Sequence, residues 1–198
     1  MSEIDPRFAG LKKLLPLTAA ALMARDKIAL QTGAVAEGEE SVPALLSRLE
    51  GKMAEIDRLR LMAHALPARE ATWLACLAAR DLLGEIPADR TPAPLAAAEA
   101  WVFKPTEENR EHARAVGETA AASDPTAQCT VPVLFCDGRL GADEKMQKFE
   151  APSAAGPLCV FALVVKAVTK DPATAEACAT RLLDRALDIA RGGSGRLA

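Results

Sequence analysis

An unbroken run of eight apolar residues, 158–165, constrains this chain more than any other feature. Pro157 precedes the run and Lys166 interrupts it. A helix that is apolar on nearly every side has to be enclosed by its neighbours. A membrane span needs about 20 predominantly apolar residues, so this run is too short to cross a bilayer. We therefore predict a core helix at 157–170 with the other segments packed around it.

The composition favours helices for those other segments. Half of the residues are hydrophobic, but only 4% are aromatic and none is tyrosine, whereas alanine and leucine are abundant. Such a core is typical of closely packed helices rather than of β-branched and aromatic strands. A chain of 198 residues is long enough to bury about 70% of its surface. We predict a single-domain, all-α irregular bundle of seven or eight helices around the core helix.

Prolines mark where those helices begin. A proline fits the first turn of a helix and breaks a helix elsewhere. Prolines that closely follow a capping or turn residue occur at positions 43, 67, 92, 125, 157 and 172. Residues 129–137 fit either an edge strand with a turn or a kinked helix. No partner strand is visible elsewhere, so a helix is preferred there.

The domain organisation follows from the same patterns. Residues 1–40 are the least regular part, and we expect a loosely attached N-terminal segment with one short helix. Residues 41–192 form the helical domain, and residues 193–198 are expected to be a frayed tail.

The N-terminal segment also imitates a secretory signal. Lys12 and Lys13 precede the apolar stretch 14–24. Pro16 near the start of that stretch, and Leu22 where a small residue is wanted, count against export. A short helix folded onto the domain is the preferred interpretation.

Charge and cysteine content limit the class of protein. The formal net charge is −3 and no basic run occurs, so nucleic-acid binding is not expected. The five cysteines are odd in number and form no C-x-x-C motif, which indicates free thiols in the reducing cytoplasm. A disulfide between Cys129 and Cys136 is the alternative to five free thiols.

Few residues are available for metal or acid-base chemistry. There are only two histidines, and Asn109 stands where a di-iron Glu-x-x-His motif ending at His112 would need a glutamate. His64 begins no zinc motif and is expected at or near the surface. No G-x-S-x-G motif occurs either, so we expect no metal and no cofactor.

Charged residues near the two tryptophans, close to helix starts, form a candidate polar network. Its members are Arg69, Glu70, Glu99 and Arg110, with Trp73 and Trp101 as aromatic neighbours. Charges are rarely buried unpaired, so a structural role that fixes helix orientation is preferred over a functional site.

These residues also carry a family resemblance. The segments 66–76, 98–102 and 105–110 resemble an uncharacterised family of bacterial all-helical proteins. In that family a Pro-x-Arg-Glu-Ala-x-Trp-x-Ala-Cys helix is followed by a Glu-x-Trp-Val helix and a Pro-x-x-x-x-Arg turn. The likeness covers about residues 55–115. This chain has Leu74 where the family often carries a second tryptophan, and residues 137–139 replace its Gly-Gly-Ser turn. The resemblance implies a bacterial accessory protein found near type VI secretion genes, and it supplies no activity.

We therefore expect a non-enzymatic adaptor or chaperone-like protein, cytoplasmic, that binds a protein partner through a helix face or groove. The first alternative is a small hydrolase or transferase that uses Glu70, Glu99 and Arg110 in a cleft. An enzyme would bring these three side chains together in a deep pocket, whereas an adaptor would expose a shallow apolar patch.

The second alternative is an immunity-type inhibitor of a toxin. Such a protein would bind through an acidic face, for which Glu107, Glu108 and Glu111 are the candidates. A concentrated acidic surface would be its mark.

Overall fold

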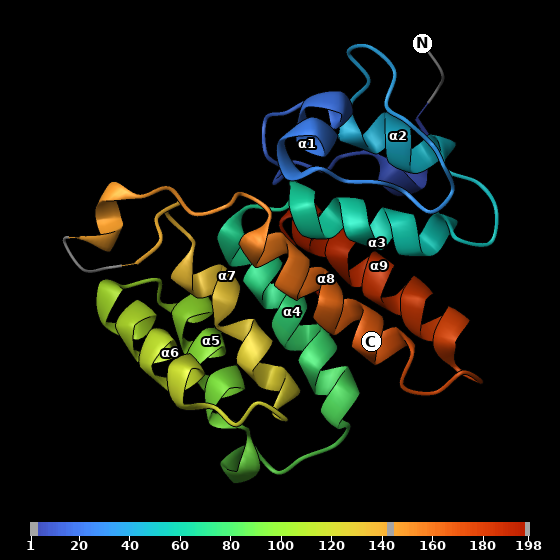
Figure 1. Cartoon of the computed structure of the whole chain (residues 1–198). Helices are drawn as coiled ribbons and strands as arrows, with labels where there is room; N and C mark the ends of the chain where they lie inside the picture. The colour runs from blue at the N-terminus through green and yellow to red at the C-terminus, as the bar shows by residue number, and fades with distance from the viewer. Residues whose placement is uncertain (1–3, 142–144, 197–198) are drawn as a thin grey trace.

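The computed structural model describes residues 4–141 and 145–196, and the fold of these residues is all-α (Figure 1). The described residues contain nine α-helices and no β-strand, apart from isolated bridges joining Thr18 to Ser41 and Arg139 to Glu150. The α-helices are α1 (Ala19–Asp26), α2 (Val42–Arg48), α3 (Ala54–Ala65), α4 (Ala68–Leu83), α5 (Ala93–Phe103), α6 (Glu107–Thr119), α7 (Val131–Leu134), α8 (Ala155–Val168) and α9 (Ala175–Arg191). Short 3-10 helices are η1 (Pro6–Phe8), η2 (Ala88–Arg90), η3 (Pro125–Cys129) and η4 (Met146–Lys148). The predicted all-α class is confirmed.

Proline marks most of the helix starts as the sequence predicts. Pro43 lies in the first turn of α2, while Pro67 and Pro92 are the N-cap residues of α4 and α5. Pro125 begins η3, which leads into α7. The prediction that residues 129–137 are helical rather than extended is therefore confirmed.

The centre of the bundle is α4. Every residue from 71 to 79 is buried, and α4 contacts α3, α5, α7, α8, α9 and η3. Figure 1 shows α4 between the group of α5, α6 and α7 and the group of α3, α8 and α9. Alanine makes this enclosure feasible, because its small side chain lets several neighbouring helices approach one helix closely.

The predicted core helix, α8, packs along α4 and also contacts α3, α7 and α9. Val160, Phe161, Leu163 and Val164 are buried. Leu158 remains 54% exposed, so α8 is not covered on every side as predicted. The neighbouring helices cover only part of the surface of α8, and Leu158, the first residue of the apolar run, faces outward.

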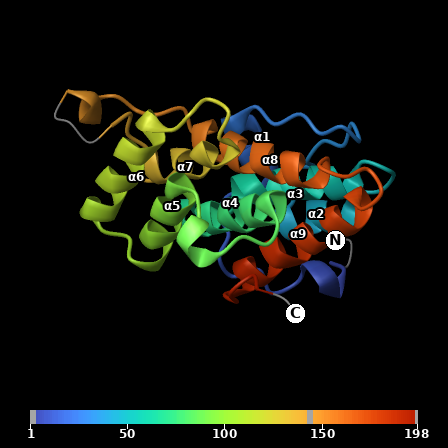
Figure 2. The same ribbon diagram turned by 90° about the horizontal axis from the view of Figure 1, so that it is seen from below.

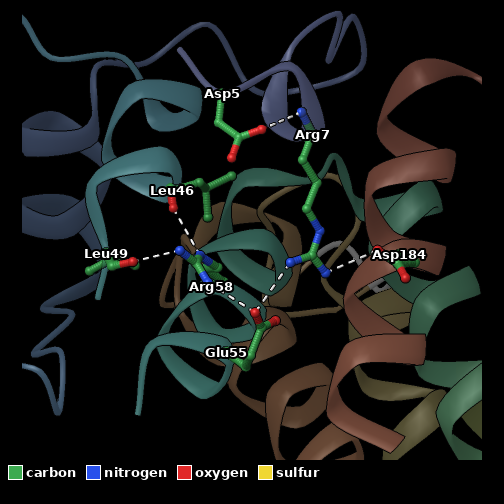
Figure 3. Close-up of polar contacts among 7 residues, drawn as sticks. All are labelled: Asp5, Arg7, Leu46, Leu49, Glu55, Arg58 and Asp184. Atoms are coloured by element: carbon green, nitrogen blue, oxygen red, sulfur yellow. Dashed lines mark hydrogen bonds and ion pairs between the residues drawn. The ribbon is translucent and has the colours of Figure 1, made fainter. Parts of the chain in front are cut away.

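The N-terminal segment differs from the prediction of loose attachment. Figure 3 shows Arg7 reaching across to two helices, with ion pairs of 3.2 Å to Glu55 on α3 and 3.0 Å to Asp184 on α9. Phe8 is 2% exposed, and the guanidinium groups of Arg7 and Arg58 lie 5.6 and 5.0 Å from the centre of its ring. Loose attachment was expected because this segment has little regular secondary structure. The side chains of Arg7 and Phe8 nevertheless anchor it to the helices.

Backbone hydrogen bonds add to this attachment. The amide of Lys13 donates to the carbonyl of Ala190 at 2.8 Å, and the amide of Leu15 donates to that of Ala65 at 2.8 Å. Further along, Leu22 of α1 is completely buried. The first helix and the segment before it therefore belong to the same packed unit as α3 and α9.

The described part of the tail is not frayed either. Trp73 Nε1 donates to the carbonyl of Ser194 at 2.6 Å, and the amide of Gly195 donates to Asp188 Oδ2 at 2.8 Å. Gly195 has φ of +67°, and a Cβ atom there would lie 2.8 Å from Ile189. Only glycine allows the chain to turn back so closely over α9. Residues 197–198 of the predicted tail lie outside the described residues.

Within the described ranges, no helix combines the length and the apolar character that crossing a bilayer requires.

Candidate functional site

The four charged residues of the predicted network do not form one cluster. At the start of α4, Arg69 Nε donates to the carbonyl of Val102 at 2.7 Å, and Glu70 pairs with Lys13 at 3.1 Å. Glu99 on α5 instead receives two hydrogen bonds of 2.6 Å from Arg80. The predicted convergence is wrong, because successive helices turn these side chains towards different neighbours.

The two tryptophans are also separated in role. Trp101 is buried in the core. Trp73 lies edge-on to Phe103 with ring centres 5.5 Å apart, and together with Arg69 and Glu70 it lines a small cavity of about 140 Å³. Three predicted residues therefore share a surface, but neither Glu99 nor Arg110 lines it.

Arg110 fixes the junction between α6 and the turn after α7. The residue is 6% exposed, and its guanidinium makes hydrogen bonds of 2.7 and 2.8 Å to Asp137 and one of 2.7 Å to the carbonyl of Leu134. Burial raises the pKa of Asp137, but the hydrogen bonds from Arg110 and the amide of Arg139, together with the charge of Arg110, outweigh burial and hold that pKa below its ordinary value. Arg110 thus joins α6 to the turn after α7, through a partner that the sequence did not indicate.

A cavity lies beside this junction, and Leu134, whose carbonyl accepts from Arg110, lines it. The cavity, which we call the α6 groove, has a volume of about 630 Å³ and lies between α6 and the segment that follows α7. Figure 2 shows α6 at the end of the molecule away from α2 and α9. Its lining residues are Glu107, Glu111, Arg114, Glu118, Leu134, Leu140, Gly141, Met146 and Gln147.

The helix wall of the α6 groove is acidic. Three glutamates and one arginine line it, and Arg114 bonds Glu111 at 2.9 Å and Glu118 at 2.7 Å. The other carboxylate oxygen of Glu111, Oε1, is buried and has no hydrogen-bond partner among the described residues. A buried acceptor in that state favours a donor from outside the chain.

The opposite wall is apolar. Leu140 and Met146 line the groove with partly exposed side chains, and Phe149, which is 59% exposed, follows on the same segment. No group of three or more His, Cys, Asp or Glu residues suited to a metal ion occurs in the described part of the chain. The groove therefore suits a ligand that presents both cationic and apolar groups.

A second polar cluster was missed by sequence reasoning. His64 is 1% exposed, not near the surface as predicted, and its Nδ1 lies 2.8 Å from Asp26 Oδ2. Arg25 holds both oxygens of Asp26 through hydrogen bonds of 2.7 Å. The apolar stripe of α3 faces the bundle, and the N-terminal segment covers the remaining face, so both faces of α3 are buried. No local sequence pattern predicts the contact between Asp26 and His64, because the two residues are 38 positions apart.

The ionisation of this cluster follows from its burial and its hydrogen bonds. Burial raises the pKa of Asp26, but hydrogen bonds from Arg25, Ser153 and His64 outweigh burial and lower the pKa to about 2. Burial lowers the pKa of His64 below 6.5, and the opposing attraction to Asp26 does not fully compensate. At neutral pH the cluster therefore holds an ionised Asp26 and a neutral His64.

The comparisons with known proteins give a family but no activity. A family model described as a family of unknown function, DUF6931, matches residues 45–190. No curated protein and no solved structure matches the chain. The matched range takes in the α6 groove and His64, but not the N-terminal segment that carries Asp26.

Proposed function

The chain belongs to the DUF6931 family of unknown function, and we propose that it is a non-enzymatic adaptor or chaperone-like protein that binds a partner protein through the α6 groove. The observation that carries the proposal is the pairing of an acidic helix wall with an apolar wall in a cavity of about 630 Å³. The partner segment is accordingly basic and amphipathic.

Charge complementarity supports this choice of partner. Three carboxylates and one guanidinium lie on the α6 wall of the groove, so an incoming lysine or arginine gains favourable electrostatic energy. The unpartnered Oε1 of Glu111 offers an acceptor for such a side chain. Charged pairs of this kind mainly speed association and select partners, while the apolar contacts with Leu140 and Met146 supply affinity.

The cellular setting is part of the same proposal. The resemblance of the helices around Trp73 and Trp101 to a bacterial family supports an accessory role in a bacterial assembly, with type VI secretion as the candidate. All five cysteines are free thiols, which supports a cytoplasmic location.

The inhibitor alternative shares this surface. Glu107 and Glu111, two of the three glutamates expected for an acidic face, line the α6 groove. An immunity-type inhibitor would place the same groove over a basic region of a toxin. Inhibition of an enzymatic activity of the captured partner would favour the inhibitor, and an unaffected partner would favour the adaptor.

The small-enzyme alternative gains no support from the geometry of the described residues, because Glu70, Glu99 and Arg110 each pair with a different residue and none of the four cavities of about 140–630 Å³ is lined by two of them. Glu70 binds Lys13, Glu99 binds Arg80, and Arg110 binds Asp137.

The test is a capture experiment from the native bacterial host with a charge-matched control. The variant Glu111→Gln/Glu118→Gln removes two negative charges from the groove but keeps oxygens that accept from Arg114. The control, Glu39→Gln/Glu176→Gln, removes two exposed carboxylates from other elements. Captured proteins are identified by mass spectrometry and their affinities measured with purified material.

We expect a partner that binds the wild type and the control alike and binds the groove variant at least tenfold more weakly, which is about 1.4 kcal/mol. Binding should also weaken as the salt concentration rises. A partner held equally well by all three proteins would show that the α6 groove is not the binding surface.

A further inference from the structure

A second cavity, separate from the α6 groove, lies where the N-terminal segment meets the starts of α4 and α8. Its volume is about 210 Å³, and it shares no lining residue with the α6 groove. His64, Leu66, Ala71 and Gly156 line it and are buried, whereas Ser153 lines it and is exposed. The cavity therefore has a buried floor and an open rim.

The floor carries one polar group that the protein does not use. His64 Nδ1 is engaged by the ionised carboxylate of Asp26, which accepts a hydrogen bond, so the ring proton of the neutral imidazole sits on Nδ1. Nε2 is then an acceptor. No hydrogen bond to Nε2 is found among the residues that the structure describes, and the ring is 1% exposed. Nε2 is not one of the fully buried side-chain atoms that lack a partner in the described residues, so a donor can reach it from the cavity that His64 lines.

The surroundings decide the kind of donor. The rest of the lining is mostly apolar and includes Leu15, Pro132 and Phe135. The charge of Arg25, the cation in the lining, is already neutralised by its two hydrogen bonds to Asp26. An anion would place its own lone pairs against the lone pair of Nε2 and would be repelled. A neutral hydrogen-bond donor therefore fits better.

We propose that this cavity binds a small, largely apolar molecule that donates one hydrogen bond, from a hydroxyl or ring N–H group, to Nε2 of His64. The volume is about 210 Å³, and since a cavity of about 150 Å³ can hold benzene, there is room for one phenol-sized ring. This site goes beyond the proposed adaptor role and does not depend on it.

The test compares p-cresol, which has a hydroxyl donor, with toluene, which has none. Binding to the full chain is followed by ¹H–¹⁵N NMR titration, with the amides of Ala71 and Gly156 as reporters of the cavity floor. His64→Phe removes the acceptor and keeps the ring, while Arg25 continues to neutralise Asp26. Ala68→Leu fills the cavity from α4 and leaves His64 in place, and Ala96→Leu on α5 is its control outside the cavity.

The wild type and Ala96→Leu should bind p-cresol at least tenfold more tightly than toluene, with shifts at both reporters. His64→Phe should lose that preference, and Ala68→Leu should lose binding of both compounds. Absence of p-cresol binding to the wild type would overturn the proposal, as would a His64→Phe variant that keeps the preference. If His64→Phe does not fold, Ala68→Leu decides alone: wild-type binding of p-cresol by that variant overturns the proposal.

Discussion

Replacing Phe8 with alanine tests whether the N-terminal segment is part of the folded unit. The ring is 2% exposed and lies between the guanidinium groups of Arg7 and Arg58. Truncating a buried phenylalanine costs about 3–5 kcal/mol, and each lost cation–π contact accounts for about 0.5–1 kcal/mol of such an effect. We expect the free energy of unfolding to fall by about 4 kcal/mol, a large part of the ~5–15 kcal/mol that domains possess.

Urea denaturation followed by circular dichroism measures this change. With a urea slope of about 3 kcal/mol/M, the midpoint should fall by more than ~1 M. Phe149→Ala is the matched control, because its ring is 59% exposed and should cost less than ~0.5 kcal/mol. Equal, small effects of both substitutions would refute the reasoning and would mean that residues 4–40 unfold separately from the helices.

Three further predictions follow from the polar groups and the thiols. Because the pKa of His64 is lowered in the folded protein, the unfolded chain binds a proton below about pH 6.5 that the folded protein does not, so stability should fall from pH 7 to pH 5 by at most about 1.4 kcal/mol per unit. Urea titrations across that range should show the slope, and His64→Phe should remove it. Arg110→Gln and Asp137→Asn should show a coupling energy of about 1–2 kcal/mol in a double-mutant cycle of thermal unfolding, and simple additivity would exclude a stabilising ion pair. Burial raises the pKa of the half-buried Cys136 and Cys159, so a thiol reagent at pH 8 should label these two thiols slowly. The three buried thiols should react only after unfolding. Rapid labelling of all five would contradict the packing.

Helix positions were predictable because their signals are local. Prolines at positions 43, 67 and 92 affect the backbone only of residues within about one helical turn. The apolar run of α8 is likewise a local signal, because its residues are consecutive in the sequence. Residues 71–79 are alanine-rich and contain Trp73, and the same composition that predicted helix also allowed α4 to become the most enclosed element.

The contacts between helices were not predictable, because they depend on the rotation and register of each helix against its neighbours. Glu99 and Arg110 were expected to meet, yet they pair with Arg80 and Asp137. The sequence identifies charged residues that need partners, but many partners of either sign lie within reach of any helix face.

Long-range anchoring escaped prediction for the same reason. Arg7 and Asp184 are 177 residues apart, and neither lies in a pattern that refers to the other. The candidate site was predictable only in part: Glu107 and Glu111 of its acidic wall were named from the sequence as an acidic face, whereas Leu140 and Met146 of its apolar wall were not.

Hydrogen–deuterium exchange of the complex with the captured partner tests the proposed binding surface most directly. Exchange is compared for the free and the bound protein, peptide by peptide. The proposal predicts slower exchange on binding in α6 and in residues 134–141, which form the two walls of the α6 groove. Protection confined to other surfaces, such as the exposed start of α8 around Leu158, would contradict it.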